Sequence, residues 1–492
     1  MVIGYWSLGI FVVELPHMVS RTLSQNTPQK IGQNVTLAGW VHNRRDHGKL
    51  IFLDMRDHTG LVQVVVNPKV SEAAHRAASE LRNEFVVTVK GQVNKRPENL
   101  INPNLPTGSV EIEASEINIL SKSETPPFEL TEDTRTVNEE LRLKYRYLDL
   151  RTPRMSKNLK TRHQVIHFLR NVLNERGFTE IQTPILTKST PEGARDYLVP
   201  SRIYPGKFFA LPQSPQQYKQ LLMVAGFDKY FQIAPCFRDE DARADRSPGE
   251  FYQLDMEMSF VDQEEILQIT EAMFTALVQT LFPEKKLKTP FARISHKEAA
   301  EKYGNDKPDL REDKNDPNEL AFCWVVDFPL FTEQTEEDYF HGAGEKWAPS
   351  HHMFTAPKPE DIALLESDPG QVRSLQHDLV LNGVEIGGGS VRIHDPKIQE
   401  KIFDLIGFNA EQKAQFAHLL EAFAFGVPPH GGIAPGIDRL VRLLLGEEKI
   451  SEVIAFPLAG SVRDPLMGSP ASVSEKQLKE LHIKLDPPTK KA

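Results

Sequence analysis

The chain has 492 residues, of which 40% are hydrophobic and 26% are charged. This composition is that of a folded globular protein and excludes a collagen-like fibre, a disordered tail protein and a polytopic membrane protein. The length corresponds to about three domains of ordinary size. The formal net charge of −10 means that any nucleic-acid partner must be met by a local basic patch. The two cysteines, Cys236 and Cys323, exclude a disulfide scaffold and fit a reducing compartment.

The first segment is expected to be an upstream extension. The apolar run Ile3–Leu15 is shorter than the ~20 residues of a membrane-spanning helix. It also lacks the basic start of a signal peptide. Met18 precedes a polar stretch that leads into strands. We therefore expect residues 1–17 to be the extension and Met18 to be the natural start.

Residues 18–122 predict a small β-barrel. Short β-branched runs at 35–41, 50–55, 61–66, 85–93 and 109–120 predict strands, and 71–81 predicts a helix. Five strands with one helix after the third match the OB-fold, with another kind of small barrel as the alternative. Arg44–Gly48 is expected between two strands, near Phe52 and Gln63. Arginine beside an exposed aromatic ring is typical of a single-strand binding face, although a solvated turn beside a core ring also fits.

The remainder of the chain alternates helices with strands. Residues 123–155 predict a linker with a charged helix at 141–150, and 483–492 predict a disordered tail. Between them, helices are expected at 157–176, 264–281, 398–405, 411–423 and 437–445. Strands are expected at 178–184, 322–328 and 379–386, with an exposed polar connection at 304–319.

A second cluster of charged residues lies around a predicted hairpin. Arg238–Arg246 holds seven charges in nine residues, and Asp255 and Glu257 stand among apolar neighbours on the returning strand. A solvated hairpin explains the loop. Buried carboxylates, however, are costly unless they are paired. The strand therefore predicts a site for a charged ligand.

Two glycine-rich segments suit a phosphate ligand. Gly387–Gly389 would let the backbone approach a ligand, and a plain glycine-rich turn is the alternative. Asp378 and Glu385 offer oxygens of the kind that Mg²⁺ prefers, provided that a bend brings them together. Gly431–Gly436 precedes a predicted helix that begins with Asp438 and Arg439, and a helix N-terminus beside arginine favours an anion. No P-loop and no catalytic triad is present in the sequence.

These segments resemble the three motifs of class II aminoacyl-tRNA synthetases. Residues 177–184 look like motif 1, 234–258 like motif 2 and 431–445 like motif 3. With a preceding OB-fold, the chain resembles the aspartyl/asparaginyl/lysyl subgroup over residues 20–480. Thr190–Arg202 and Leu211–Lys219 are similar to the bacterial-type aspartyl-tRNA synthetases. The resemblance implies an α+β architecture, in which the OB-fold precedes a catalytic domain at 156–482 built on an antiparallel sheet.

The resemblance also implies a reaction and its residues. ATP and Mg²⁺ would activate L-aspartate for transfer to tRNA-Asp by a cytoplasmic homodimer joined through motif 1, with no membrane partner. The residues implied to bind aspartate are Glu192, Ser214, Gln216, Lys219, Arg238, Gln253, Asp255, His351 and Arg392. Those implied to bind ATP are Arg238, Asp239, Glu240, Phe251, Glu385, Gly436, Ile437, Asp438 and Arg439. Arg238, Glu240 and Arg439 are the implied catalytic groups, Asp378 and Glu385 the metal ligands, and Arg45, His47, Phe52 and Gln63 the anticodon contacts.

The sequence departs from that family at three places. An inserted domain found in most bacterial members is missing, and only residues 304–319 stand at its position. Ser247 replaces a glutamine that contacts ATP in many relatives. His47 stands where members specific for tRNA-Asp often carry leucine, which implies that tRNA-Asn is also charged.

Three other functions were weighed against this one. Lys219 together with Arg392 argues against an asparagine enzyme, because a neutral amide would leave buried charge unpaired. The intact motif residues argue against a non-catalytic RNA-binding paralogue. The attached barrel argues against an enzyme of amino-acid biosynthesis that uses no tRNA.

Overall fold

The computed structural model describes residues 21–190, 194–240, 249–333 and 346–486. The predicted extension at 1–17, Glu192, Ser247 and the end of the tail lie outside these ranges. The chain divides into two compact units, with the division after Glu132. None of the described helices combines the length and the apolar character that crossing a membrane requires.

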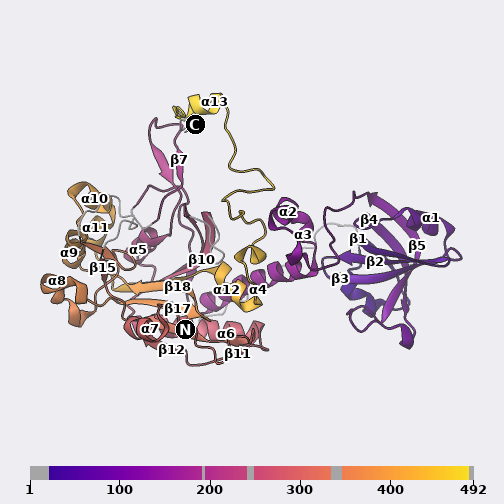
Figure 1. Ribbon diagram of the computed structural model, residues 1–492, viewed down its shortest axis with the longest axis horizontal. Coiled ribbons are helices and arrows are strands. Elements are labelled where there is room, and N and C mark those ends of the chain that lie inside the picture. The colour runs from indigo at the N-terminus through magenta and orange to yellow at the C-terminus, as the bar shows by residue number, and fades with distance from the viewer. Residues whose placement is uncertain (1–20, 191–193, 241–248, 334–345, 487–492) are drawn as a thin grey trace, which may run out of the picture. The chain divides into compact units, whose positions relative to one another are not determined.

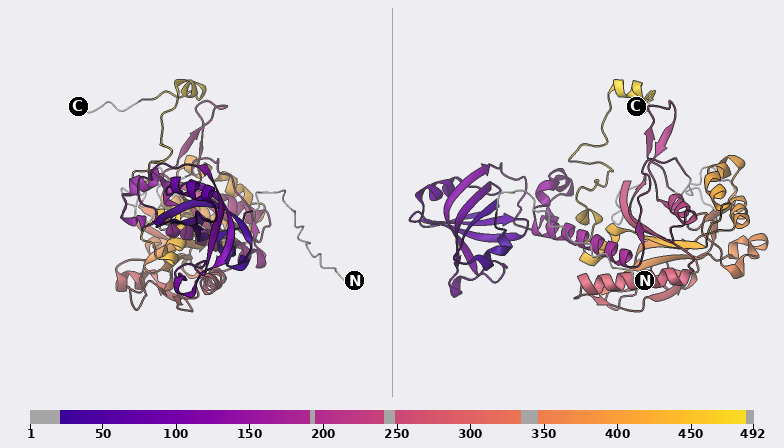
Figure 2. Two further views of the ribbon diagram at one scale, coloured as in Figure 1. Left: turned by 90° about the vertical axis from the view of Figure 1, so that its right-hand side faces the viewer. Right: turned by 180° about the vertical axis from the view of Figure 1, so that it is seen from behind.

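The first unit is a closed five-stranded barrel with the strand order β1-β2-β3-β5-β4 (Figures 1 and 2). Its elements are β1 (Asn34–His47), β2 (Leu50–Asp57), β3 (Gly60–Val66), α1 (Glu72–Glu80), β4 (Val86–Lys95) and β5 (Val110–Ser121). The pairs are antiparallel except for β3 with β5. Buried apolar residues alternate along each strand and fill the interior. This arrangement confirms the predicted OB-fold, including the helix after the third strand.

One detail of the barrel differs from the prediction. The Arg44–His47 segment does not form a turn, because β1 continues to His47 and pairs with β2 as far as Leu50. Arg45 lies directly opposite Phe52 in this register. Cross-strand neighbours point to the same face of a sheet. The longer strand therefore places the basic residues on the barrel wall.

The predicted linker at 123–155 is only partly a linker. The division falls inside it, and its second half packs into the second unit as α2 (Glu139–Lys144) and α3 (Arg146–Asp149). Arg142 donates hydrogen bonds to Glu452, and Arg146 pairs with Asp149 and donates to backbone oxygens at 451–455. These buried ion pairs and hydrogen bonds hold α2 and α3 against residues 451–455 of the second unit. The single helix expected at 141–150 is broken at Tyr145.

The second unit is built on an eight-stranded sheet with the order β12-β14-β17-β18-β19-β10-β9-β6. The strands are β6 (Thr179–Glu180), β9 (Lys229–Arg238), β10 (Gly249–Ser259), β12 (Ala292–Ser295), β14 (Phe322–Val326), β17 (Gln376–Leu381), β18 (Val384–Val391) and β19 (His430–Pro435). The central strands are antiparallel, and each edge strand pairs in parallel with its neighbour. The antiparallel catalytic sheet implied by the resemblance is therefore present.

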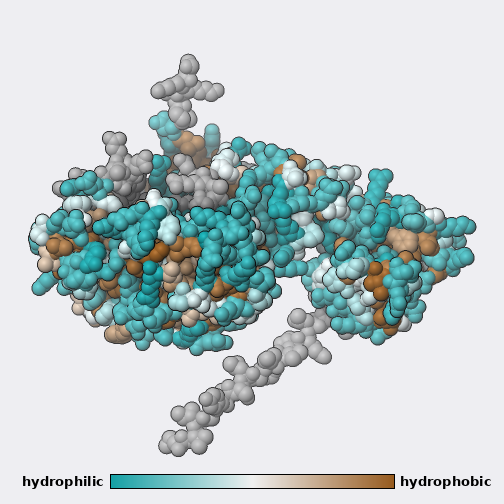
Figure 3. Space-filling model, turned by 60° about the horizontal axis from the view of Figure 1, so that its bottom comes forward, coloured by the Kyte–Doolittle hydropathy of each residue, from teal (hydrophilic) through white to brown (hydrophobic). Residues whose placement is uncertain are grey.

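Helices cover one face of this sheet. The main core unites α4 (Pro153–Glu175), α6 (Gln263–Leu281) and α12 (Ile437–Leu445) with apolar residues of β10, β17 and β18. A second core joins α9 (Pro396–Ile406) and α11 (Ala417–Phe423) to the loops around Phe354. The remaining helices are α5 (Gln216–Val224), α7 (His296–Tyr303), α8 (Leu364–Ser367), α10 (Ala410–Ala414) and α13 (Glu475–Glu480). On the face drawn in Figure 3, hydrophilic side chains cover most of the surface.

Short strands complete the second unit. They are β7 (Leu198–Pro200) with β8 (Phe208–Ala210), β11 (Lys286–Leu287) with β13 (Glu319–Leu320), and β15 (Phe331–Glu333) with β16 (Trp347–Pro349).

Three sequence predictions for the second unit need correction. The single strand expected at 379–386 is a hairpin of β17 and β18 that turns at Asn382 and Gly383, where positive φ angles permit a tight turn. The helix expected at 411–423 is two helices that meet at Phe416. The strand expected at 178–184 is ordered as β6 over only two residues.

Candidate active site

The register of β10 sorts its side chains between two faces. Leu254, Met256 and Met258 point into the main core, whereas Gln253, Asp255 and the following Glu257 point the other way, because successive residues of a strand alternate. Phe251 continues this row at the open end. One strand therefore carries both an apolar wall and a row of polar groups.

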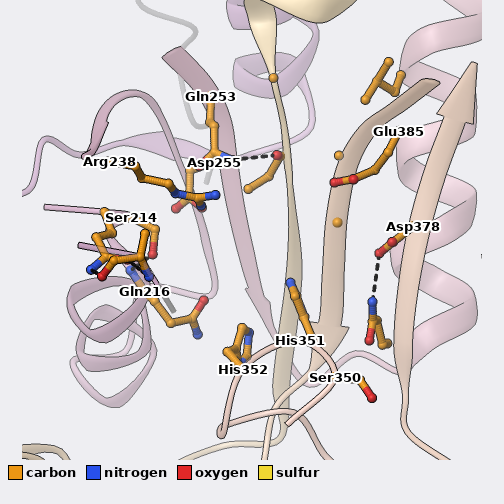
Figure 4. A pocket seen from close by; sticks show the side chains of 18 of the residues that line it. Ser214, Gln216, Arg238, Gln253, Asp255, Ser350, His351, His352, Asp378 and Glu385 are labelled. Carbon is orange, nitrogen blue, oxygen red and sulfur yellow. Dashed lines mark hydrogen bonds between the residues drawn. The ribbon is translucent and has the colours of Figure 1, made fainter. Parts of the chain in front are cut away.

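The polar row forms one wall of a cavity of about 610 Å³. Figure 4 shows Arg238, Gln253 and Asp255 on one side of it and Asp378 and Glu385 on the other. The predicted site residues that line this one cavity are Ser214, Gln216, Lys219, Arg238, Glu240, Phe251, Gln253, Asp255, His351, Asp378, Glu385, Arg392, Gly436, Asp438 and Arg439. Two predicted ATP contacts do not line it: Asp239 is exposed, and the Ile437 side chain is buried in the main core.

Four charged side chains form a buried cluster at the inner end of the cavity. Lys219 Nζ lies 2.7 Å from Asp255 Oδ1 and 3.3 Å from Glu257 Oε2. Arg392 donates to both oxygens of Glu257, at 2.9 and 3.1 Å. All four residues are at most 2% exposed. Buried charges are tolerated only when paired in this way.

The surroundings shift the pKa values of Asp255 and Glu257 in opposite directions. Burial raises the pKa of Asp255, although Lys219 opposes this effect. Glu257 is equally buried, yet Arg392 and Lys219 together lower its pKa to about 2. Glu257 is thus an anion at neutral pH, between the two cations. Glu257 is not among the residues that the resemblance implies for aspartate binding, although its spacing of two from Asp255 on a strand is the signal that places it on the same face.

The predicted cations of the aspartate pocket are therefore paired and not free. Lys219 and Arg392 pair with the carboxylates of Asp255 and Glu257, so these four groups carry no net formal charge. Arg238 lines the same cavity and adds one positive charge. Histidines beside them add no charge at neutral pH, since burial and Arg392 lower the pKa of His351 to about 3.

The other end of the cavity suits a nucleotide. The guanidinium carbon of Arg238 lies 5.1 Å from the centre of the Phe251 ring. Arg238 Nε is buried and has no hydrogen-bond partner among the described residues. Arg439, in the first turn of α12, donates to the backbone oxygen of Glu385 at 2.8 Å. An aromatic face beside one arginine, with a second arginine in the same cavity, offers stacking and anion contacts together.

Two carboxylates meet on the β17–β18 hairpin. The hairpin and a register shift after Leu379 supply the bend that sequence analysis required, and both Asp378 and Glu385 line the cavity. Burial and the nearby Glu385 raise the pKa of Asp378 well above its usual range. A divalent cation would relieve this repulsion. Among the described residues no group of three or more metal-binding side chains is present, so a bound ion would need further oxygens from its ligand and from water.

The three consecutive glycines of β18 are required for two separate steric reasons. A Cβ on Gly387 would come within 2.5 Å of the Pro435 backbone, and one on Gly389 within 2.2 Å of the Gly432 oxygen. These two glycines therefore allow β18 and β19 to pack. A Cβ on Gly388 would instead stand 3.1 Å from Asp378 Oδ1 and 3.5 Å from His351 Nε2, inside the cavity. Gly387–Gly389 therefore lie within strand β18 and do not form the plain glycine-rich turn of the alternative interpretation.

The connection at 304–319 contributes to the site as well. Its residues 312–318 are mostly exposed, as expected, but Asp306 lines the cavity. Lys307 Nζ lies 3.6 Å from Glu385 Oε2. No motif in the sequence marked these two residues, because their role depends on packing against the β17–β18 turn.

The predicted anticodon contacts share the outer wall of the barrel. Arg45 pairs with Asp54 at 2.9 Å, and the His47 ring meets the Phe52 ring edge-on with centres 6.2 Å apart. Gln63 is 9% exposed, and its amide bridges Arg96 and Glu111. Arg45, His47 and Phe52 thus form an accessible group, while Gln63 takes part in a network of the wall.

Comparisons with known proteins agree with this geometry. Residues 138–460 match the family model of class II tRNA synthetases (D, K and N), and residues 35–120 match the OB-fold nucleic acid binding domain. In structure, the chain is similar to asparaginyl-tRNA synthetase from Pyrococcus horikoshii complexed with asparaginyl-adenylate. The TM-score is 0.72 with 26% identity, and the match covers 89% of this chain and 98% of that one. The chain is a class II aminoacyl-tRNA synthetase.

Curated relatives define the family more closely. The aspartate–tRNA(Asp/Asn) ligase of Dehalococcoides mccartyi is 44% identical over 593 aligned positions, which cover 93% of this chain and 98% of the relative. The enzyme of the same name from Rubrobacter xylanophilus is 43% identical, and the alignment covers 95% of this chain and 97% of the relative. The chain therefore belongs to the aspartate–tRNA ligase family. Because the alignments are longer than the 492 residues of this chain, these relatives contain residues that it lacks.

Proposed function

We propose that the protein joins L-aspartate to tRNA-Asp through an aspartyl-adenylate formed from ATP, and that it also charges tRNA-Asn. The observation that carries the proposal is the buried charged cluster at the inner end of the cavity. The four groups of the cluster have no net formal charge, Arg238 in the same cavity adds one positive charge, and aspartate carries one net negative charge. Asparagine and lysine do not match this balance, so their complexes would leave a buried charge uncompensated.

Each charged part of aspartate has a complementary group. Lys219 and Arg392 bind the side-chain carboxylate, and Asp255 accepts the α-ammonium group. Arg238 binds the α-carboxylate and the α-phosphate of ATP, which agrees with its position between the cluster and Phe251. Ser214, Gln216, Gln253, His351 and Glu192 complete the amino-acid pocket.

ATP occupies the end of the cavity with the two arginines. Phe251 stacks on one face of adenine and Arg439 on the other, and Glu240 contacts the nucleotide. Asp378 and Glu385 hold Mg²⁺, which when bound neutralises charge on the phosphate oxygens. No protein nucleophile is required, because the aspartate α-carboxylate itself attacks the α-phosphorus of ATP and pyrophosphate leaves. The 3′-hydroxyl of the terminal adenosine of the tRNA then attacks the carbonyl of the aspartyl-adenylate, and AMP leaves. The chain contributes alignment of the two reactants and stabilisation of the developing charge.

The barrel binds the anticodon of the tRNA. Arg45 and Phe52 lie opposite each other on the outer wall, an arrangement suited to a phosphate and a stacked base. His47 contacts the same ring and supports the wider tRNA specificity, in line with the names of the relatives. The enzyme acts in the cytoplasm as a homodimer. Exposed Ile185 and Leu186, directly after motif 1, support this interface.

Amino-acid-dependent pyrophosphate exchange tests the activation step. Aspartate, asparagine and lysine are compared side by side at equal concentration, and exchange with aspartate alone is expected. Dominant exchange with asparagine or lysine would contradict the proposal. Aspartylation of tRNA-Asp and tRNA-Asn transcripts then tests the tRNA specificity. Absence of product with tRNA-Asn would refute the dual specificity and leave the activation step unaffected.

A further inference from the structure

Helix α4, which precedes motif 1, contacts the nucleotide site through one side chain. Arg162, on α4, forms an ion pair between Nη1 and Asp438 Oδ1. The Arg162 side chain is 16% exposed and that of Asp438 only 3%. Arg162 does not line the cavity, so it does not touch a ligand bound there.

Asp438 uses its second oxygen to hold another element. Asp438 Oδ2 accepts a hydrogen bond of 3.0 Å from the backbone nitrogen of Tyr252 on β10. The guanidinium carbon of Arg162 also lies 5.8 Å from the centre of the Tyr252 ring. One carboxylate therefore connects α4, β10 and the first turn of α12.

The two connected segments carry Phe251 and Arg439, the proposed contacts on the two faces of adenine, and the space between these two side chains is called the adenine slot. Tyr252 directly follows Phe251, and Asp438 directly precedes Arg439. Their separation fixes how closely a ring can be held between Phe251 and Arg439. Loss of Arg162 would leave a buried carboxylate without its cation, which is costly unless the surrounding segments rearrange. Such a rearrangement would weaken the hydrogen bond that Asp438 accepts from β10.

We propose that Arg162 is a positioning residue for ATP, which acts through Asp438 to set the width of the adenine slot. This inference rests on the proposed function of the cavity and assigns a role in it to helix α4, whose Arg162 does not line the cavity. The aspartate pocket should be much less affected, since Lys219 and Arg392 are held by a different pair of carboxylates, Asp255 and Glu257.

The test compares Arg162→Ala, Arg162→Lys and a matched control on the same helix. Arg170→Ala removes an exposed bidentate pair with Glu180, whose side chains are 42% and 32% exposed. Pyrophosphate exchange is measured against ATP and against aspartate. We expect R162A to raise the KM for ATP at least tenfold and the KM for aspartate less than twofold, R162K to recover part of the loss, and R170A to match the wild type.

Equal increases in both KM values, or an ATP KM within twofold of the wild type in R162A, would overturn the proposal. Should R162A fail to fold, R162K and Arg162→Gln provide the same comparison of the two KM values. A double-mutant cycle of Arg162→Ala with Asp438→Asn tests whether Arg162 acts through Asp438. The ATP KM of the double variant should be no higher than that of the poorer single variant. A KM increase equal to the product of the two single increases would contradict the proposal. Titration calorimetry with α,β-methylene-ATP measures the same affinity without turnover, so that a failure of the proposed activity is distinguishable from a failure of this inference.

Discussion

Replacement of Glu257 by glutamine would test whether the buried cluster is held together by charge. Glutamine keeps the volume and one acceptor oxygen, so no cavity forms, but it leaves Arg392 and Lys219 with Asp255 as their remaining carboxylate. Lowering the pKa of Glu257 from 4.5 to about 2 corresponds to about 3 kcal/mol. Breaking a buried ion pair from one side generally costs about 3–5 kcal/mol. We therefore expect E257Q to lower the free energy of unfolding of the catalytic unit by about 3 kcal/mol at pH 7.

The pH dependence of this loss has a defined sign. Because the folded state lowers the pKa of Glu257, the stabilisation is complete above the unfolded pKa near 4.5 and disappears as the pH falls towards 2. The difference between wild type and E257Q should therefore be smaller at pH 4 than at pH 7, by about 1 kcal/mol.

Urea unfolding followed by tryptophan fluorescence measures both quantities, since Trp324 and Trp347 lie in the catalytic unit. Lys90→Gln, which removes an exposed pair with Glu116 on the barrel, is the control and should change stability by less than about 1 kcal/mol. A loss below about 1 kcal/mol in E257Q at pH 7, or a loss that grows on acidification, would refute the reasoning.

Three further outcomes are expected. Arg238→Ala should lower aspartate-dependent pyrophosphate exchange by at least about a hundredfold while circular dichroism shows a folded protein; near-normal exchange would exclude its role. Asp378→Asn should raise the Mg²⁺ concentration needed for half-maximal exchange about tenfold or more, because one of two carboxylates is lost, and an unchanged magnesium titration would argue against this ligand. Phe52→Ala should weaken tRNA binding by about 1–3 kcal/mol in a filter-binding assay and leave pyrophosphate exchange unaltered; a change in exchange without a change in tRNA affinity would contradict the assignment.

The local elements of the fold could be predicted because they depend on short-range patterns. The strands of the barrel follow β-branched runs between turn residues, and helix α6 follows an apolar period with an Asp262 cap. The strand expected at 379–386 overlooks a local signal, because Asn382-Gly383 between apolar runs favours the tight turn of a hairpin. The packing of α2 and α3, in contrast, depends on a neighbour in space, since Arg142 pairs with Glu452, about three hundred residues further along the chain.

The sequence by itself determined which residue types are available and in what order, and this was enough for the barrel, the three motifs and fifteen of the residues that line the cavity. Only the tertiary structure decided how their charges are balanced. Whether Lys219 and Arg392 are free or paired depends on Glu257, which approaches them from another element. The connection of Arg162 to Asp438 spans 276 positions. Electrostatic energy falls with distance in space and not along the chain, so ion pairs between distant segments leave no pattern in the sequence.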